Sequence, residues 1–176
     1  FATRQPDIQA RAIGEQVPPG ELFQFVPSLE GTPFIDPNAP AAERYGYITN
    51  LGSAGGIVRY HSPDGLHWKH DATPLFRFLS DTQNVAFWDQ RLGAYVLYLR
   101  GWNPKYRTVV RATLPSITQP SPVVPSGKGR PAGTEGGLRY VLDELPTVFA
   151  TDAQDPTRTD IYNMVAQPYP LDPASY

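Results

Sequence analysis

Asp81 and Asp160 are the residues of this chain whose setting most clearly suggests chemistry. Each aspartate opens a segment that continues through polar or aromatic residues, which are Gln83, Asn84, Tyr162 and Asn163. Two carboxylates held close together can do general acid–base chemistry, one donating a proton and the other acting as nucleophile or base. We therefore take Asp81 and Asp160 as candidate acids, with the alternative that each only caps a turn.

A third aspartate and a tryptophan are further candidates. Asp36 could supply another acid, but it begins an Asp-Pro-Asn sequence, which is ordinary turn chemistry, and we favour the turn. Trp102 follows a predicted strand and precedes an Asn-Pro pair, so we expect it in an exposed loop, where its ring can stack on a ligand. No glutamate stands in a comparable motif, so a general acid cannot be assigned.

The histidines do not predict a metal site. Residues 67 and 70 would face opposite sides of a strand, so they could not chelate one ion together. The chain contains no cysteine, which excludes disulfides and thiolate ligands. The residues alone therefore predict no metal and no cofactor.

The composition predicts a folded all-β domain. At 176 residues the chain has the length of one domain, and 40% of its residues are hydrophobic, too many for a disordered chain. The 20 prolines and 15 glycines favour short strands and long connections over helices. Lysines and arginines are scattered around a formal charge of −2, so no nucleic-acid surface is predicted. No apolar run approaches the roughly 18 residues of a membrane-spanning helix.

Several short strands are predicted from the middle of the chain onward. Their ranges are 45–49, 56–61, 66–69, 84–88, 94–100, 106–113, 138–142, 147–150 and 161–167. Residues 62–65 (SPDG) predict a tight turn, and a loop that ends in Gly93 predicts a hairpin between 84–88 and 94–100. Both faces of that hairpin are apolar, so we expect its sheet to be covered on two sides.

Two stretches rich in proline and glycine divide the chain. Residues 1–40 predict an extended arm, with one short helix near Ile8–Gln16. Residues 114–137 predict a long loop within the strand-bearing region 41–176. Long segments of this kind suit contacts with a neighbouring chain.

Three segments together resemble the five-bladed β-propellers of the glycoside hydrolase family 32/43 type. Residues 62–68 (SPDGLHW) are similar to the S-x-D-G-x-x-W hairpin of these proteins. Residues 81–89 (DTQNVAFWD) resemble the D-x-Q-N-x-x-F-W-D stretch of bacterial family 32-like hydrolases, and residues 160–170 (DIYNMVAQPYP) resemble their D-x-Y-x-x-x-x-x-P-Y-P segment. The order and spacing also fit, and the resemblance covers residues 31–176.

The resemblance implies an all-β, partial five-bladed propeller, with about two to three blades in this chain. The acids of this family lie on the innermost strands around a central funnel, which implies Asp81 and Asp160 as the acidic pair and Asp36 as a first-blade acid. The implied substrate-binding residues are Gln83, Asn84, Trp102, Tyr162 and Asn163. A calcium ion in the funnel would fit the family, but the sequence contains no recognisable ligand set for it.

The resemblance also implies a function and a location. It indicates a secreted or periplasmic carbohydrate-active protein, which hydrolyses or binds a polysaccharide or oligosaccharide. The alternative is a non-catalytic propeller that binds glycans or serves as an assembly subunit. In either case other protein chains could complete the propeller or the assembly.

Overall fold

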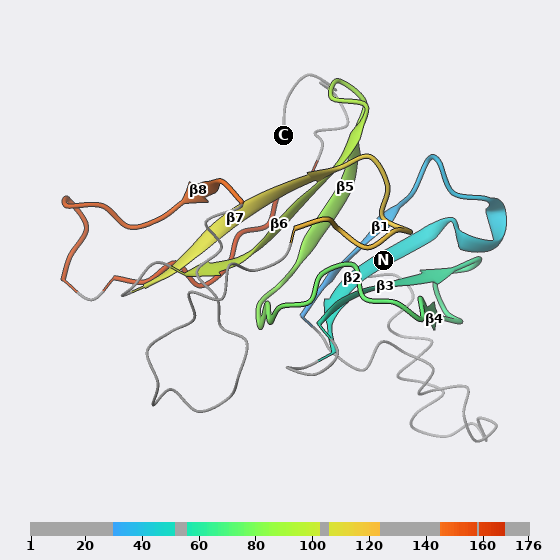
Figure 1. The fold of residues 1–176 in the computed structure, drawn as a ribbon, viewed down its shortest axis with the longest axis horizontal. Helices are drawn as coiled ribbons and strands as arrows, with labels where there is room; N and C mark the ends of the chain where they lie inside the picture. Colours follow the sequence, from blue (N-terminus) through green and yellow to red (C-terminus); the bar gives the residue numbers. More distant parts are fainter. Residues whose placement is uncertain (1–29, 52–55, 103–105, 124–144, 158, 168–176) are drawn as a thin grey trace, which may run out of the picture.

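The computed structural model describes residues 30–51, 56–102, 106–123, 145–157 and 159–167, which form two four-stranded antiparallel sheets (Figure 1). The first sheet follows chain order and comprises β1 (Thr32–Ile35), β2 (Tyr45–Asn50), β3 (Ile57–Ser62) and β4 (Lys69–His70). The second comprises β5 (Val85–Asp89), β6 (Ala94–Trp102), β7 (Arg107–Leu114) and β8 (Thr147–Phe149). A 3-10 turn, η1 (Ala41–Glu43), is the one helical element of this described part. The prediction of an all-β chain is confirmed, and the described strands form no closed barrel or propeller.

The predicted turn at residues 62–65 is longer than expected. Asp64 Oδ1 accepts hydrogen bonds from the backbone N–H groups of Leu66 (2.8 Å) and His67 (2.9 Å), and Ser62 Oγ accepts one from Gly65 (2.9 Å). These bonds hold the chain in a bend, so the strand predicted at 66–69 shortens to β4. Burial raises the pKa of Asp64, but the hydrogen bonds from His67, Leu66 and Ser62 outweigh it, and the pKa lies well below its ordinary value.

The predicted hairpin in the second sheet is confirmed as β5 and β6. Its loop ends in Gly93, whose φ of +59° lies in the left-handed region that glycine adopts without strain. All nine residues of β6 are buried, as expected for a strand that is apolar on both faces. One face packs on the first sheet, and the other is covered by Ile161, Met164 and Ala166.

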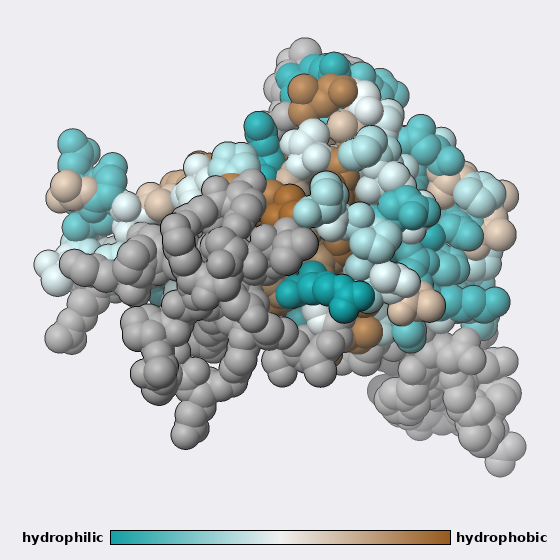
Figure 2. All heavy atoms as spheres, viewed as in Figure 1, coloured by the Kyte–Doolittle hydropathy of each residue, from teal (hydrophilic) through white to brown (hydrophobic). Residues whose placement is uncertain are grey.

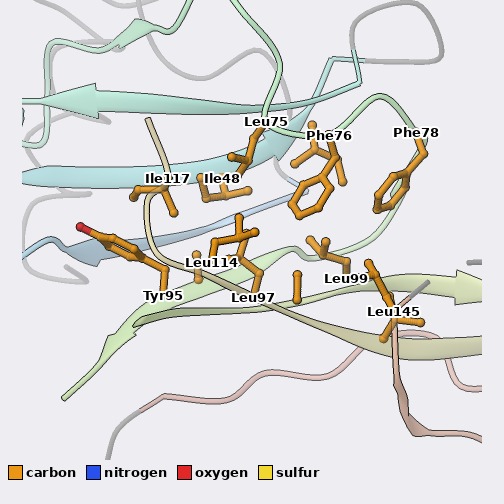
Figure 3. Close-up of a cluster of buried hydrophobic side chains, with 14 of the residues drawn as sticks. Ile48, Leu75, Phe76, Phe78, Tyr95, Leu97, Leu99, Leu114, Ile117 and Leu145 are labelled. Carbon is orange, nitrogen blue, oxygen red and sulfur yellow. The ribbon is translucent and has the colours of Figure 1, made fainter. Parts of the chain in front are cut away.

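A shared hydrophobic core joins the two sheets (Figure 3). Ile48 and Ile57 come from the first sheet, and Leu97 and Leu99 come from β6 of the second. The connection between the sheets adds further buried side chains, which are Leu75, Phe76 and Phe78. Each fully buried side chain of this size stabilises the fold by about 1.5–3 kcal/mol relative to exposure. Figure 2 shows apolar residues in the middle of the molecule and mostly hydrophilic ones over the first sheet.

Asn84 links the starts of the two sheets. It forms a parallel bridge with Gly31, which places the beginnings of β1 and β5 side by side. Its side chain is fully buried at 0% exposure, and Nδ2 donates to the carbonyl oxygens of Glu30 (2.7 Å), Ser80 (3.1 Å) and Thr82 (3.0 Å). The hydroxyl of Ser80 donates to Asn84 Oδ1, so both ends of the amide are satisfied.

Part of the stretch predicted as an arm belongs to the first sheet. β1 lies within residues 1–40 and pairs with β2, where Phe34 faces Gly46. A Cβ at Gly46 would lie 2.4 Å from the Phe34 ring, so this glycine makes room for the aromatic side chain. The rest of the predicted arm, including the helix near Ile8–Gln16, lies outside the described residues.

Two further stretches differ from the sequence-based expectations. The predicted loop at 114–137 begins with a packed segment, because Ile117 is buried in the shared core and Ser121 N donates to Leu75 O at 2.7 Å. The strand predicted at 161–167 is wrong, because this segment has no strand pairing and covers the second sheet as an irregular chain. Strand 147–150 is confirmed as β8, whereas 138–142 lies outside the described residues. Among the described residues, no helix has the length and apolarity needed to cross a membrane.

Candidate functional site

Two arginines bring the candidate acids Asp81 and Asp160 into one cluster. Arg100 lies near the end of β6, and Arg107 begins β7, directly opposite Trp102 in the strand register. Asp81 lies just before β5, whose first residue pairs with Tyr98 of β6. The acids therefore meet at the same end of the second sheet. We refer to the following residues as the ion-pair cluster: Asp81, Arg100, Trp102, Arg107, Asp160 and Tyr162.

Arg100 is the buried centre of the ion-pair cluster. Its side chain is 1% exposed; Nη1 lies 3.2 Å from Asp81 Oδ1, and Nη2 donates to Tyr162 O at 2.6 Å. Burial lowers the pKa of the Arg100 guanidinium, and the charge of Asp81 opposes that shift. Because a guanidinium stays protonated in proteins, Arg100 places a fixed positive charge beside Asp81.

Asp160 is held by Arg107 in a similar way. Its Oδ1 accepts a hydrogen bond from the Arg107 backbone N–H at 2.7 Å, and its Oδ2 is paired with Arg107 Nη1. Both side chains of this pair are partly exposed. Asp160 therefore lies at the accessible edge of the ion-pair cluster, whereas Arg100 lies beneath it.

Two aromatic rings flank the guanidinium groups. The Arg100 Cζ atom lies 5.0 Å from the ring centre of Tyr162 and 5.9 Å from that of Trp102, and the corresponding distances for Arg107 are 5.5 Å and 4.9 Å. Tyr162 is 63% exposed, but Trp102 is only 6% exposed. The expectation that Trp102 lies in an exposed loop is therefore wrong. Strand β6 extends through Gly101 to Trp102, which leaves Tyr162 as the accessible ring.

The other predicted contact residues do not all belong to the ion-pair cluster. Asn163 is exposed next to Tyr162, whereas Gln83 donates to Thr32 Oγ1 at 3.2 Å and so contacts the first sheet. Asn84 is buried and fully hydrogen-bonded, so it positions the chain and has no capacity left for a ligand.

Asp36 lies at a different place in the fold. It is buried, accepts a hydrogen bond from Tyr95 Oη at 2.8 Å and caps its own turn through Asn38 N at 3.0 Å. Tyr95 lies near the start of β6, whereas Arg100 lies near its end, about 16 Å along the strand. The turn interpretation of Asp36 is thus the one its contacts favour.

The ion-pair cluster has no deep cavity in the described residues. The hollow bounded by Thr82, Arg100 and Tyr162 is too narrow to hold a water molecule. Thr82 Oγ donates to Tyr162 O at 2.9 Å, which closes this hollow from one side. A ligand would therefore lie on the outer surface, against Tyr162 and the Arg107–Asp160 pair.

Sequence reasoning missed the two arginines and one glutamate. Arg100 is the one charged residue in the apolar run 94–100, and a charge in such a run usually has a buried partner, so this signal was present. Glu30 lies two residues before the start of β1; its carbonyl oxygen accepts from Asn84 N at 2.9 Å, and its carboxylate accepts from Asn50 Nδ2 at 3.3 Å. Glu30 is therefore a third carboxylate at the end of the sheets where β1 and β5 begin.

Comparisons with known proteins add no family assignment, because no family model, curated protein or solved structure matches this chain. Within the described residues, no three His, Asp or Glu side chains lie close enough together to hold a metal ion. The site is therefore defined by its own geometry.

Proposed function

We propose that this chain binds a carbohydrate on the outer surface of the ion-pair cluster. The observation that carries the proposal is the exposed ring of Tyr162, which lies beside two guanidinium–carboxylate pairs. The face of an aromatic ring is apolar and negatively polarised, so it suits the C–H face of a sugar. Arg107 can donate to sugar hydroxyls and Asp160 can accept from them, because both are partly exposed.

The shallow surface favours binding of a chain-like glycan over enclosure of a small sugar. Small-molecule sites are usually clefts that bury most of the ligand, and the hollow at Arg100 is too narrow for that. A glycan lying across Tyr162 would need no such cleft. The non-catalytic alternative is therefore the form of the proposal that the geometry supports best.

We further propose that the two sheets are consecutive blades of a family 32/43-like propeller. Each sheet is a four-stranded meander in chain order, which is how propeller blades are built. The parallel Gly31–Asn84 bridge supports this proposal because it sets the first strands of the two sheets side by side. The segment after Asp160 continues the series, since Tyr162 O is bonded to Thr82 next to β5.

Glycoside hydrolysis is a second candidate, and Glu30 is the observation that favours it. The three sequence motifs contain no glutamate that could donate a proton. Glu30 is a candidate for that role, because it lies at the end of the sheets where Asp81 lies. In this version Asp81 or Asp160 acts as nucleophile or base, and Glu30 acts as the acid. If wild type releases reducing sugar from the bound glycan and Glu30→Gln does not, the result would support hydrolysis. If wild type binds the glycan without releasing sugar, the result would favour the non-catalytic function.

A binding experiment with a matched control tests the main proposal. Wild type is screened on a glycan array, and the best ligand is titrated by calorimetry into wild type, Tyr162→Ala and Phe149→Ala. Phe149 is another exposed aromatic residue, but it lies on β8 and outside the ion-pair cluster. We expect Tyr162→Ala to weaken binding about two- to tenfold, from the 0.5–1.5 kcal/mol of an aromatic contact, and Phe149→Ala to leave it unchanged. Equal affinities for wild type and Tyr162→Ala would overturn the proposal.

A further inference from the structure

The first sheet carries a cavity of about 490 Å³ that the ion-pair cluster does not use. It is lined by side chains from η1, the end of β3, the 62–68 turn and β4, which are Ala42, Glu43, His61, Pro63, His67, Trp68 and Lys69. Its volume falls within the roughly 300–1,000 Å³ of small-molecule sites. Such sites combine apolar walls with a few convergent polar groups, and this lining has both.

The cavity lies at the end of the first sheet opposite to the ion-pair cluster. Ser62 at the end of β3 pairs with Tyr45, and Tyr45 pairs with Ile35 at the end of β1. The start of β1, by contrast, is the end where Gly31 meets Asn84. The two places are thus separated by at least the four residues of β1, about 13 Å.

Carboxylates and an arginine contact the polar groups that line the cavity and hold them in place. His67 Nδ1 lies 2.7 Å from Asp64 Oδ2, and His61 Nδ1 lies 3.2 Å from Asp71 Oδ1 without the alignment of a hydrogen bond. Arg59 holds one carboxylate oxygen of Glu43 at 2.8 Å.

The chemistry of these groups selects the kind of ligand. The hydrogen bond from Arg59 holds the pKa of Glu43 below its ordinary value, so Glu43 is an acceptor, and the ammonium of Lys69 is a donor. The imidazole rings of His61 and His67 also belong to the lining, and an imidazole nitrogen can accept or donate a hydrogen bond. Because the lining combines one carboxylate acceptor, one ammonium donor and two imidazole rings, it suits hydroxyl groups, which both donate and accept, better than an anion or a cation.

We infer that this cavity is a second binding site, for a neutral mono- or disaccharide or a similar polyol. Its apolar walls, Ala42, Pro63 and Trp68, would contact the C–H groups of the ligand, while Glu43 and Lys69 hydrogen-bond its hydroxyls. The choice of a sugar over another polyol rests on the proposed function. The existence of the site rests only on the cavity and its lining.

The three tryptophans allow one NMR titration to test both sites. Trp68 lines the cavity, Trp102 belongs to the ion-pair cluster, and Trp88 packs against the shared core. Indole N–H resonances, assigned with Trp→Phe variants, are followed while glucose, xylose, cellobiose, sorbitol, sodium acetate and tetramethylammonium chloride are added separately. We expect a neutral probe to shift Trp68 and the ring signals of His61 and His67, with Trp88 and His70 unchanged.

Variants then separate the two proposals. Lys69→Met should raise the Kd of the probe, measured at Trp68, roughly ten- to a hundredfold, the loss expected for a hydrogen bond to a charged donor, and Tyr162→Ala should leave that Kd unchanged. A Trp68 response with no binding at Tyr162 would sink the proposed function and keep this inference. Glycan binding at Tyr162 with no Trp68 response to any probe would overturn this inference alone. A Trp68 response confined to acetate or to tetramethylammonium would overturn the neutral ligand class.

Discussion

Replacing Arg100 by methionine tests whether the ion-pair cluster holds the segment after Asp160 against the second sheet. Methionine keeps an unbranched apolar chain but removes the guanidinium. The variant therefore loses the contact with Asp81 Oδ1 at 3.2 Å and the hydrogen bond to Tyr162 O at 2.6 Å. The remaining packing on β6 is largely preserved.

The expected loss of stability follows from what each partner can do afterwards. Removing one member of a buried ion pair costs about 3–5 kcal/mol. Two features reduce that cost here: the Asp81 carboxylate is partly exposed and can be rehydrated, and Tyr162 O keeps its hydrogen bond from Thr82. We therefore expect Arg100→Met to lower the free energy of unfolding by about 2–3 kcal/mol. For a chain of this size that corresponds to a Tm decrease of about 4–12 °C.

The measurement is urea denaturation followed by circular dichroism, with Arg77→Met as the matched control. Arg77 is exposed, so the same change of charge and shape should alter stability by no more than about 0.5 kcal/mol. A double-mutant cycle with Asp81→Asn isolates the pair, and we expect a coupling energy of about 1–2 kcal/mol. The reasoning is refuted if Arg100→Met is no less stable than Arg77→Met, or if the coupling is zero.

Three further predictions concern glycine conformation, the shared core and acid stability. Gly93→Ala should lower the free energy of unfolding by about 1–2 kcal/mol, because the φ of this residue is +59°. Gly56→Ala should lower it by more, because φ is +69° and a Cβ would also lie 2.3 Å from Phe76 O. Thermal unfolding ranks the two variants, and the reverse order would contradict this account. Leu97→Ala, at a fully buried position, should lower the free energy of unfolding measured in urea by about 2–5 kcal/mol. A decrease of less than about 1 kcal/mol would argue against the shared core. Burial raises the pKa of Asp64, but the hydrogen bonds of the turn lower it by more, so its pKa is lower in the folded protein than in the unfolded chain. The ionised carboxylate therefore stabilises the fold above the unfolded pKa of about 3.9, and this contribution is lost as the pH falls below that value. Asp64→Asn should therefore flatten the dependence of stability on pH in that range, and an unchanged slope would refute the assignment.

The fold could be predicted from the sequence where local pattern decides the structure. Two apolar faces and a loop ending in Gly93 were enough for the hairpin of β5 and β6, and for the cover on both sides of it. Residues 161–167 were predicted wrongly as a strand because their apolar side chains do pack on the second sheet, as those of a strand would. Their backbone, however, is bonded by side chains of Thr82 and Arg100 in place of a neighbouring strand.

The candidate site was predictable only in part. Asp81 and Asp160 were identified, and they do lie in one cluster; the charge of Arg100 in an apolar run indicates a buried partner, but not which carboxylate that partner is. Trp102 was misplaced because Gly101 reads as a strand end, whereas in the sheet it leaves room for Val110 and Thr108 side chains within 3 Å of where its Cβ would be. These pairings depend on contacts between residues far apart in the chain, which no local pattern records.

The amide of Asn84 has a consequence for the order in which the molecule folds. In both sheets the paired strands are consecutive in the chain, and apart from β7 and β8 they are joined by short loops, so most of each meander can form locally. Joining the two meanders requires contacts across much longer loops: Asn84 to Glu30 spans 54 residues, and Gln83 to Thr32 spans 51. Closing such loops costs entropy before it is rewarded, so docking is the slow step. We therefore expect the bonds of Asn84 to form as the two meanders dock, so that Asn84→Ala slows docking as well as hastening unfolding.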